Sequence, residues 1–361
     1  MNSNWLFSYQ RDLLLLFVPV WLTWMAAFLL PSHILQADAP LWVLLVFVFG
    51  IDVSHVWTTL FRTYLDRDEF AHHRQLLISA PIIAFLLSFA LASVSTDLFW
   101  RCLAYIAVFH FVKQQYGFMR IYKAKSKDFQ KKFLSDNFAI YLSMLYPIFY
   151  WHLNIDRNFQ WFVEGDFIQY QLPDQITYYF NNLGNIIYLL LLGVWFFEEL
   201  YLKSKTGNRL AIGKILWIFT TAGNWYLGIV YFNSDVVFTI TNVVAHGLPY
   251  IALIIFYTDR KRAIKIASRP LKQVFKIAFT IVLVALLLAF FEEFLWDRLI
   301  YQEEGGVFQI IINTPFPEIS TPVKSFAIAA LSIPQATHYI LDGFIWKSNN
   351  KNPYIKPILL E

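Results

Sequence analysis

The sequence predicts an all-α integral membrane protein, a polytopic helical bundle with about ten transmembrane helices. Hydrophobic residues make up 58% of the 361 positions and charged residues only 15%, with a mean hydropathy of +0.48. A soluble domain is closer to half apolar and a quarter charged. Apolar runs of roughly 20 residues, the length of a helix that crosses a bilayer, recur from one end of the chain to the other.

Each expected helix is an apolar run bounded by charged or turn-forming residues. No long soluble segment separates the runs, so we expect residues 1–361 to form a single transmembrane domain. The first run is longer than the apolar region of a cleaved leader, so we expect it to remain as a helix. The ten expected spans are residues 12–31, 41–61, 76–94, 98–119, 138–153, 177–200, 215–232, 236–257, 277–296 and 323–346.

The basic residues predict the orientation of these spans. All but five of the 29 Lys and Arg residues fall on segments of one side when the amino terminus is placed in the cytoplasm. Cytoplasmic loops carry such an excess of Lys and Arg, so we expect both termini to be cytoplasmic. Nothing in the basic loops suggests nucleic-acid binding. The five exceptions are Arg101, Lys113, Arg157, Arg298 and Lys324.

Two features of the composition limit the kinds of site and the classes of protein that the chain can represent. Cys102 is the only cysteine, which excludes an intrachain disulfide and any cysteine-based zinc or iron–sulfur site. Glycine is scarce, with 13 residues, whereas aromatic residues reach 19%. Transporters that rock between states commonly use glycine-interrupted helices and small-residue contacts. The bulky composition therefore favours a rigid bundle around a fixed site.

Four of the eight histidines lie inside expected spans: His55, His110, His246 and His338. Ionisable side chains are costly in a bilayer core, so each one calls for a functional hypothesis. All four spans are expected to run from outside to cytoplasm, with the histidine in or near the inner half. We therefore expect the four imidazoles to converge in one layer of the bundle and to ligate a metal.

Each of these histidines has a polar companion one helical turn away, on the same helical face. Metal-ligating histidines usually donate their second ring N–H to a carboxylate or carbonyl, which sets their orientation. We expect the companions to orient the histidines or to ligate the metal themselves. The pairs are Asp52 with His55, Gln114 with His110, Asn242 with His246, and Asp342 with His338.

Imidazole and carboxylate groups suit iron, copper or zinc. An inner-leaflet site walled by aromatic residues suits a long apolar substrate. The sequence thus favours a non-haem iron oxidoreductase of the oxygenase, desaturase or hydroxylase type that acts on a lipid, fatty acyl or isoprenoid substrate. We expect an electron donor on the cytoplasmic side. Asp52, Asp342 and Lys113 are the candidate catalytic residues. Lys113 is expected to pair with Asp52 or Asp342, or to bind an anionic head group.

In general character the chain is similar to the polytopic histidine-rich membrane oxygenases, namely desaturases, hydroxylases and bacterial carotene dioxygenases. The desaturase boxes HxxxH and HxxHH are absent and the histidines are far more widely spaced, so no residue roles are carried over from those families.

The sequence is also consistent with three other functions. Histidines on facing helices also ligate b-type haem, and four histidines would satisfy two haems as axial pairs. The same His and Asp residues would also serve a proton- or ion-coupled transporter. The chain could also be a purely structural membrane subunit, but that function would not explain why acidic residues are buried. His72 and His73 lie in "FRTYLDRDEFAHHR", close to the expected metal layer. We expect this segment to be a solvated loop; the alternative is that it folds back to close the site or to contact a redox partner.

Overall fold

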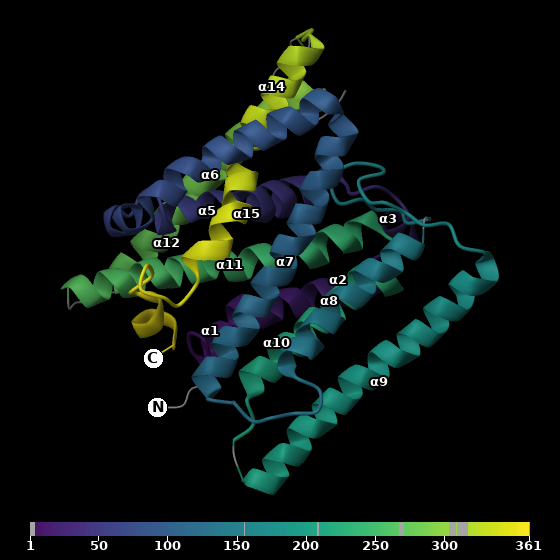
Figure 1. Ribbon diagram of the computed structural model, residues 1–361, viewed down its shortest axis with the longest axis vertical. Helices are drawn as coiled ribbons and strands as arrows, with labels where there is room; N and C mark the ends of the chain where they lie inside the picture. The colour runs from purple at the N-terminus through teal and green to yellow at the C-terminus, as the bar shows by residue number, and fades with distance from the viewer. Residues whose placement is uncertain are drawn as a thin grey trace.

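The computed structural model describes residues 4–154, 156–207, 209–266, 271–302, 308 and 317–360. Within these residues all regular structure is helical, which confirms the all-α class (Figure 1). In chain order the elements are α1 (Tyr9–Asp12), η1 (Leu13–Phe17), α2 (Val18–Leu29), α3 (Ser32–Leu35), α4 (Leu41–Val43), η2 (Leu44–Val53), α5 (Ser54–Arg62), α6 (Arg67–Val94), α7 (Thr96–Ser126), α8 (Asp136–Leu153), α9 (Asp174–Thr206), α10 (Ile212–Trp225), η3 (Tyr226–Tyr231), α11 (Asp235–Ile266), α12 (Leu271–Trp296), η4 (Asp297–Tyr301), α14 (Thr321–Leu331), α15 (Ile333–Ile345) and η5 (Lys356–Leu360).

Six helical segments of the described chain are long and apolar enough to cross a membrane. The other expected spans coincide with α7, α8, α10–η3 and α14–α15, which are helical but either shorter or more polar. The chain is thus compatible with a membrane protein, and six is the number of crossings that length and composition support. The six segments are Tyr9–Leu29, Leu41–Arg62, Arg67–Val94, Asp174–Thr206, Asp235–Ile264 and Lys272–Tyr301.

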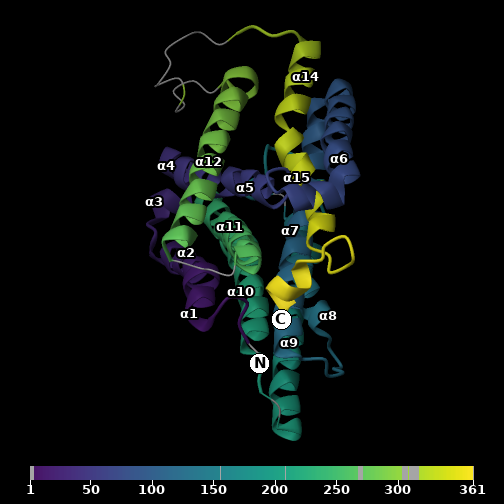
Figure 2. The ribbon, with the colours of Figure 1, turned by 90° about the vertical axis from the view of Figure 1, so that its left-hand side faces the viewer.

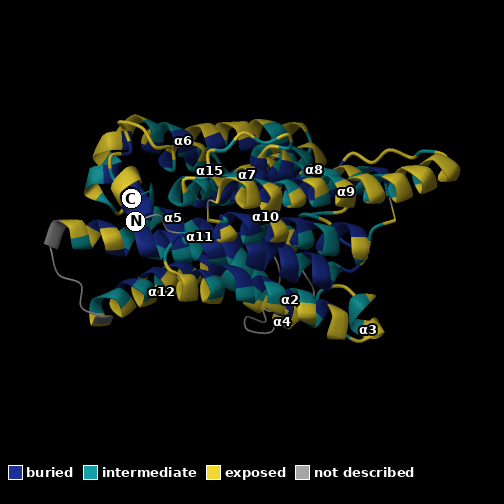
Figure 3. Ribbon diagram, turned by 90° about the horizontal axis from the view of Figure 1, so that it is seen from below, coloured by how far each residue is buried: buried dark blue, intermediate teal, exposed yellow. Residues whose placement is uncertain are grey.

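Helix α11 forms the centre of the bundle. In its most apolar window 72% of the residues are buried, against 22–33% in the other five candidate spans. Figure 3 shows α11 mostly buried, whereas α6 and α9 present exposed faces. Helix α11 packs against α2, η2, α5 and α12. Because it is enclosed on most sides, polar side chains in its middle are buried in protein, among them Thr241, Asn242 and His246.

The second candidate span contains a stretch of π-helix, η2, directly before His55. Single π-helical turns inside α-helices are frequent at functional sites because the extra residue changes where the following side chains point. Gly247 on α11 allows this segment to come close, since a Cβ at that position would lie 2.6 Å from Ile51 Cγ2. The close approach brings the backbones next to His55 and His246 together.

The expected last span, 323–346, is not one continuous helix. Helix α14 ends at Leu331 and α15 starts at Ile333, with Ser332 between them. Pro334 stands in the first turn of α15, where its missing N–H costs no hydrogen bond but prevents a continuous helix. The break gives α15, which carries His338, its own direction.

A buried cluster of charges joins α8, α9 and α10 at one end of the bundle. Lys214 Nζ lies 3.0 Å from Asp136 Oδ1 and 2.5 Å from Glu199 Oε1, and it also pairs with Asp128. Lys132 contacts the same three carboxylates. These carboxylates lie close enough together to suggest a metal site, but the ammonium groups of Lys132 and Lys214, with that of Lys123 beside Asp136, already neutralise them. We therefore assign the group, called the acid–lysine cluster below, to stability.

The two ends of the chain lie near one another. The labels N and C are adjacent in all three ribbon views, on the same side of the bundle (Figures 1, 2 and 3). In Figures 1 and 2, α5, α7, α11 and α15 meet in the middle of the molecule. These four helices are the ones that carry the histidines of the expected site.

Candidate metal centre

The four expected histidines form a closed ring of imidazoles, called the histidine quartet below. Each ring meets two others edge to face, and all four residues are buried, with exposures of 1–4%. The neighbouring ring centroids are 4.6 Å apart for His55 and His246, 5.0 Å for His246 and His110, 4.6 Å for His110 and His338, and 5.0 Å for His338 and His55.

The ring nitrogens of the quartet point at a common centre. The Nε2 atoms of His55 and His246 are 3.1 Å apart, and so are those of His110 and His338. One ring nitrogen from each residue lies within 4.8 Å of the others. A metal with bonds of about 2.1 Å to four nitrogens needs neighbouring nitrogens roughly 3.0–3.4 Å apart. The His55–His246 and His110–His338 pairs meet this requirement.

Hydrogen bonds behind His338 determine which of its nitrogens carries the proton. Tyr250 OH donates to Asp342 Oδ1 at 2.9 Å, Thr59 Oγ1 lies 3.0 Å from Tyr250 OH, and His338 Nδ1 lies 2.8 Å from Thr59 Oγ1. Because the Tyr250 proton is already donated to Asp342, Thr59 donates to Tyr250 and His338 Nδ1–H donates to Thr59. The lone pair of Nε2 is then left facing the centre, as a metal ligand requires.

Asp342 faces a different histidine from the one expected. It follows His338 by one helical turn, but its Oδ2 lies 3.6 Å from His110 Nδ1. Its Oδ1 accepts from Tyr250 and from Trp346 Nε1, the latter at 3.0 Å. The expectation that Asp342 orients His338 directly is therefore wrong, because the carboxylate reaches His338 only through Tyr250 and Thr59. The side chain instead turns toward the neighbouring helix α7.

Asp52 lies beside His55, as its spacing predicts. The Oδ1 atom is 3.6 Å from His55 Nδ1, which is too long for a hydrogen bond. Within the described chain His55 Nδ1 and His246 Nδ1 have no hydrogen-bond partner. Buried polar atoms are rarely left unpaired, and such exceptions concentrate at catalytic or ligand-binding positions.

The amide companions support the backbone rather than the imidazoles. Gln114 Nε2 donates to the carbonyl of His246 at 2.8 Å instead of contacting His110. Asn242 Nδ2 donates to the carbonyl of Phe238 at 2.9 Å, so its amide does not orient His246. The helical spacing placed both residues on the expected face, but the neighbouring helix determined their partners.

Lys113 does not reach the quartet. Its ammonium group is exposed, donates to Tyr141 OH at 3.3 Å, and lies over the rings of Phe109 and Tyr116. The expected pairing with Asp52 or Asp342 is therefore wrong. Lysine stems can extend along apolar surface toward water, and this one leaves the bundle instead of crossing it.

His72 and His73 also stay outside the quartet, but in a helix rather than the expected loop. Both lie in α6, where His72 Nδ1 contacts the carbonyl of Asp68 at 2.6 Å. His73 Nε2 is 2.7 Å from Asn352 Oδ1. The ring of His72 thus stays on its own helix, whereas His73 holds the start of α6 against the carboxyl-terminal segment.

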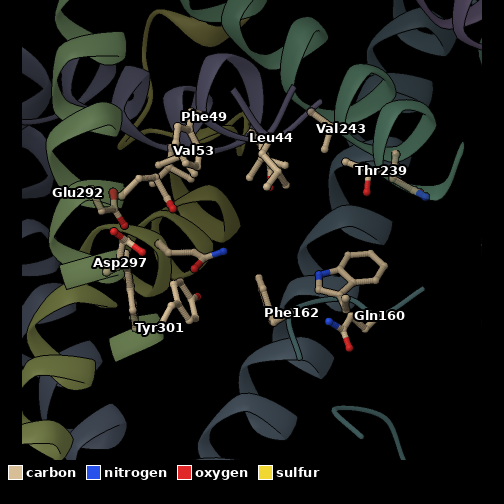
Figure 4. A pocket seen from close by; sticks show the side chains of 18 of the residues that line it. Leu44, Phe49, Val53, Gln160, Phe162, Thr239, Val243, Glu292, Asp297 and Tyr301 are labelled. Atoms are coloured by element: carbon tan, nitrogen blue, oxygen red, sulfur yellow. The ribbon is translucent and has the colours of Figure 1, made fainter. Parts of the chain in front are cut away.

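Two aromatic rings cover the quartet. Phe111 stacks on His246 with ring centroids 3.5 Å apart, and Tyr339 lies 4.7 Å from His110. Both side chains also line a cavity of 320 Å³, which lies on the side of these rings away from the quartet. None of the four imidazoles is among its lining residues, so one layer of side chains separates the cavity from the quartet. Figure 4 shows Glu292 and Asp297 toward one side of this cavity, and Thr239 and Gln160 toward the other.

Sequence reasoning missed several residues around the quartet: Thr59, Tyr250, Trp346, Phe111 and Tyr339. Thr59 and Tyr250 each follow a quartet histidine by four residues, so the rule that selected Gln114 and Asp342 would also have found them. The aromatic residues carried no distinguishing signal in a chain this rich in Phe, Tyr and Trp.

Comparison with known proteins assigns no family to the chain: no family model, no curated protein and no solved structure matches it.

Replacing Thr59 with valine should weaken metal binding by about tenfold, because His338 Nδ1 loses its acceptor and its tautomer is no longer held. The measurement is a metal titration of the chelator-treated protein. Thr337→Val is the matched control, since this buried hydroxyl lies next to His338 and has no hydrogen-bond partner in the described chain. Equal affinities for the two variants would contradict the proton assignment.

Proposed function

We propose that this chain is a membrane metalloenzyme in which the histidine quartet holds one non-haem iron ion and oxidises a lipophilic substrate. The observation that carries the proposal is the convergence of four buried imidazoles from four helices, with one nitrogen of each within 4.8 Å of the others. Packing alone gives no reason to place four ionisable rings together in an apolar bundle, because each one costs free energy to bury.

The donor set favours iron, with copper and zinc as the competing metals. Imidazole binds all three, and the single cysteine offers no set of thiolates that would select otherwise. Metal-bound histidines commonly have a carboxylate behind the ring, and Asp52 and Asp342 supply two here. Of the three metals, we favour iron because non-haem iron sites with histidine ligands activate dioxygen next to a substrate-binding cavity.

The packing of the rings favours a bare ion over haem b. A bis-histidine haem needs a porphyrin between its two axial rings. In the quartet each ring is flanked by two other imidazoles, with centroids 4.6–5.0 Å away. A macrocycle would have to displace all four helices, whereas a single ion needs only the space between the Nε2 atoms.

Dioxygen is the proposed oxidant. Insertion of both oxygen atoms into the substrate needs no further electrons. Hydroxylation or desaturation also consumes two electrons and two protons and releases water, and we propose a donor on the cytoplasmic side for these. Asp342, Tyr250 and Thr59 form a hydrogen-bonded chain that ends at His338. Their role is to hold the ligand tautomer while the ion binds.

We further propose that α7, α8, α10–η3 and α14–α15 also cross the bilayer, which gives about ten crossings with both termini in the cytoplasm. The distribution of Lys and Arg supports this orientation, and the two termini lie on one side of the bundle. Reporter fusions at the two ends would test the topology.

Elemental analysis combined with an absorption spectrum tests the metal proposal. We expect iron near one equivalent per chain, no Soret band, and dioxygen uptake when a lipid extract is added. A Soret band near 410 nm would show haem instead. Metal-free protein that moves a solute across proteoliposomes would contradict the enzyme and support transport through the same residues.

A further inference from the structure

The 320 Å³ cavity lies directly beside the histidine quartet. All four helical segments that carry the histidines contribute to its wall, through Asp52, Phe111, Asn242 and Tyr339. Three of these side chains also contact or approach quartet rings, at 3.5–4.7 Å. The volume is within the range of small-molecule sites. A molecule in this cavity would be separated from the metal centre by one layer of side chains.

Most of the cavity wall is apolar and aromatic. Trp100, Trp161 and Trp296 line it, together with Phe49 and Phe162. The rings of Phe and Trp offer apolar surface and no hydrogen-bonding group except the indole N–H, so they suit a hydrocarbon body. The wall therefore predicts a ligand that is apolar over most of its length.

The charged residues described in the wall are all acidic. Its described lining residues include no Lys or Arg, and among them are five acidic residues: Asp52, Asp235, Glu292, Glu293 and Asp297. Glu292 is 7% exposed and accepts from Trp57 Nε1 at 2.6 Å, which holds its carboxylate in place. A ligand carboxylate or phosphate in this cavity would find no cationic side chain among these described lining residues, and an anion buried without a cation is costly.

One buried acceptor in the wall also lacks a donor. Asn242 is 6% exposed, and its Oδ1 has no hydrogen-bond partner within the described chain. The orientation of the amide follows from its Nδ2, which donates to the carbonyl of Phe238. An unpaired buried acceptor costs roughly 1–3 kcal/mol, and a donor brought by a ligand would recover part of that cost.

We propose that this cavity binds a lipid whose head group donates hydrogen bonds and carries no negative charge, a long-chain alcohol or amine rather than a fatty acid. The carboxylates around Glu292 and Asp297 accept from the head group, and the aromatic wall encloses the chain. Treating this lipid as the substrate rests on the proposed function, but binding itself requires neither metal nor turnover.

Photoaffinity labelling in lipid nanodiscs tests the head-group preference. The probes are hexadecanol, hexadecylamine and palmitic acid, each with a diazirine in mid-chain and each present at the same mole fraction. We expect the alcohol, the amine or both to label peptides of α7 and α11 about tenfold more than the acid, equivalent to about 1.4 kcal/mol. Labelling by the alcohol alone would indicate a neutral lipid, and labelling by the amine alone a cationic one. Equal labelling by the acid, or labelling confined to the exposed helix α9, would overturn the proposal.

Glu292→Gln tests the acidic end while keeping an acceptor for Trp57. This variant should lose most of the preference for the alcohol and amine over the acid. Glu164→Gln, a change in an exposed loop residue, is the control and should behave as wild type. An unchanged preference in Glu292→Gln would overturn the assignment. If this variant does not fold, the comparison of probes on the wild-type chain decides the question.

Running the labelling on both chelator-treated and iron-loaded protein separates the two proposals. Head-group selectivity that persists without bound metal would support the cavity assignment even if iron analysis fails. Stoichiometric iron with no head-group selectivity would leave the metal centre in place and overturn the lipid class.

Discussion

Replacing any one of His55, His110, His246 or His338 with alanine should remove the metal from the protein. Each imidazole is one of four ligands around a common centre, and each is buried at 1–4% exposure, so no water-exposed group can take its place. Loss of a ligand should lower affinity by more than the 10–100-fold typical of a group behind the ligand. Metal content after gel filtration over a chelator is the measurement.

His72→Ala is the matched control for these variants, because this exposed imidazole contacts only the backbone of its own helix among the described residues. It should retain the wild-type metal content. Addition of imidazole to His246→Ala should restore part of the binding if the loss is local rather than a failure to fold. Full metal retention in three of the four quartet variants would show that the residues do not share a site.

Replacing Lys214 with methionine should produce the largest loss of stability. Lys214 is fully buried and forms ion pairs with Asp128, Asp136 and Glu199. Removing one partner of a buried ion pair costs about 3–5 kcal/mol, because the remaining charges stay in a medium of low polarity. Thermal unfolding followed by tryptophan fluorescence should show a decrease in Tm on the order of 5–10 °C.

Lys205→Met, an exposed change at the end of α9, is the control and should leave Tm nearly unchanged. Adding Glu199→Gln to Lys214→Met should recover part of the loss, since it removes one of the stranded charges. A Tm equal to wild type for Lys214→Met alone would contradict the role given to the acid–lysine cluster.

The acid–lysine cluster also implies sensitivity to acid. Burial on its own would raise the pKa of Asp128, but the ammonium groups of Lys214 and Lys132 together outweigh burial and lower the pKa below its usual 3.8. A carboxyl group whose pKa is lower in the folded state stabilises that state above its unfolded pKa. This contribution is therefore present at neutral pH and is lost as the pH falls through the lowered value.

The sequence by itself determined the helical class and the choice of four histidines from eight. Both follow from the cost of burying unpaired polar groups. A long apolar segment must be helical so that its backbone N–H and C=O groups are hydrogen-bonded, and an imidazole inside such a segment needs a polar partner. His55, His110, His246 and His338 were therefore identifiable without coordinates. The companion Asp52 was also placed correctly, because a spacing of three residues on one helix is independent of the rest of the fold.

Only the tertiary structure decided which groups meet across helices. Asp342 turned to His110 rather than to its own neighbour His338, Lys113 pointed away from the bundle, and Gln114 took the backbone of α11 as its partner. The break at Ser332 and the π-helical stretch before His55 set the directions of two histidine-bearing helices. Helical periodicity specifies the face on which a side chain lies, but the rotation and crossing of neighbouring helices specify what that face contacts.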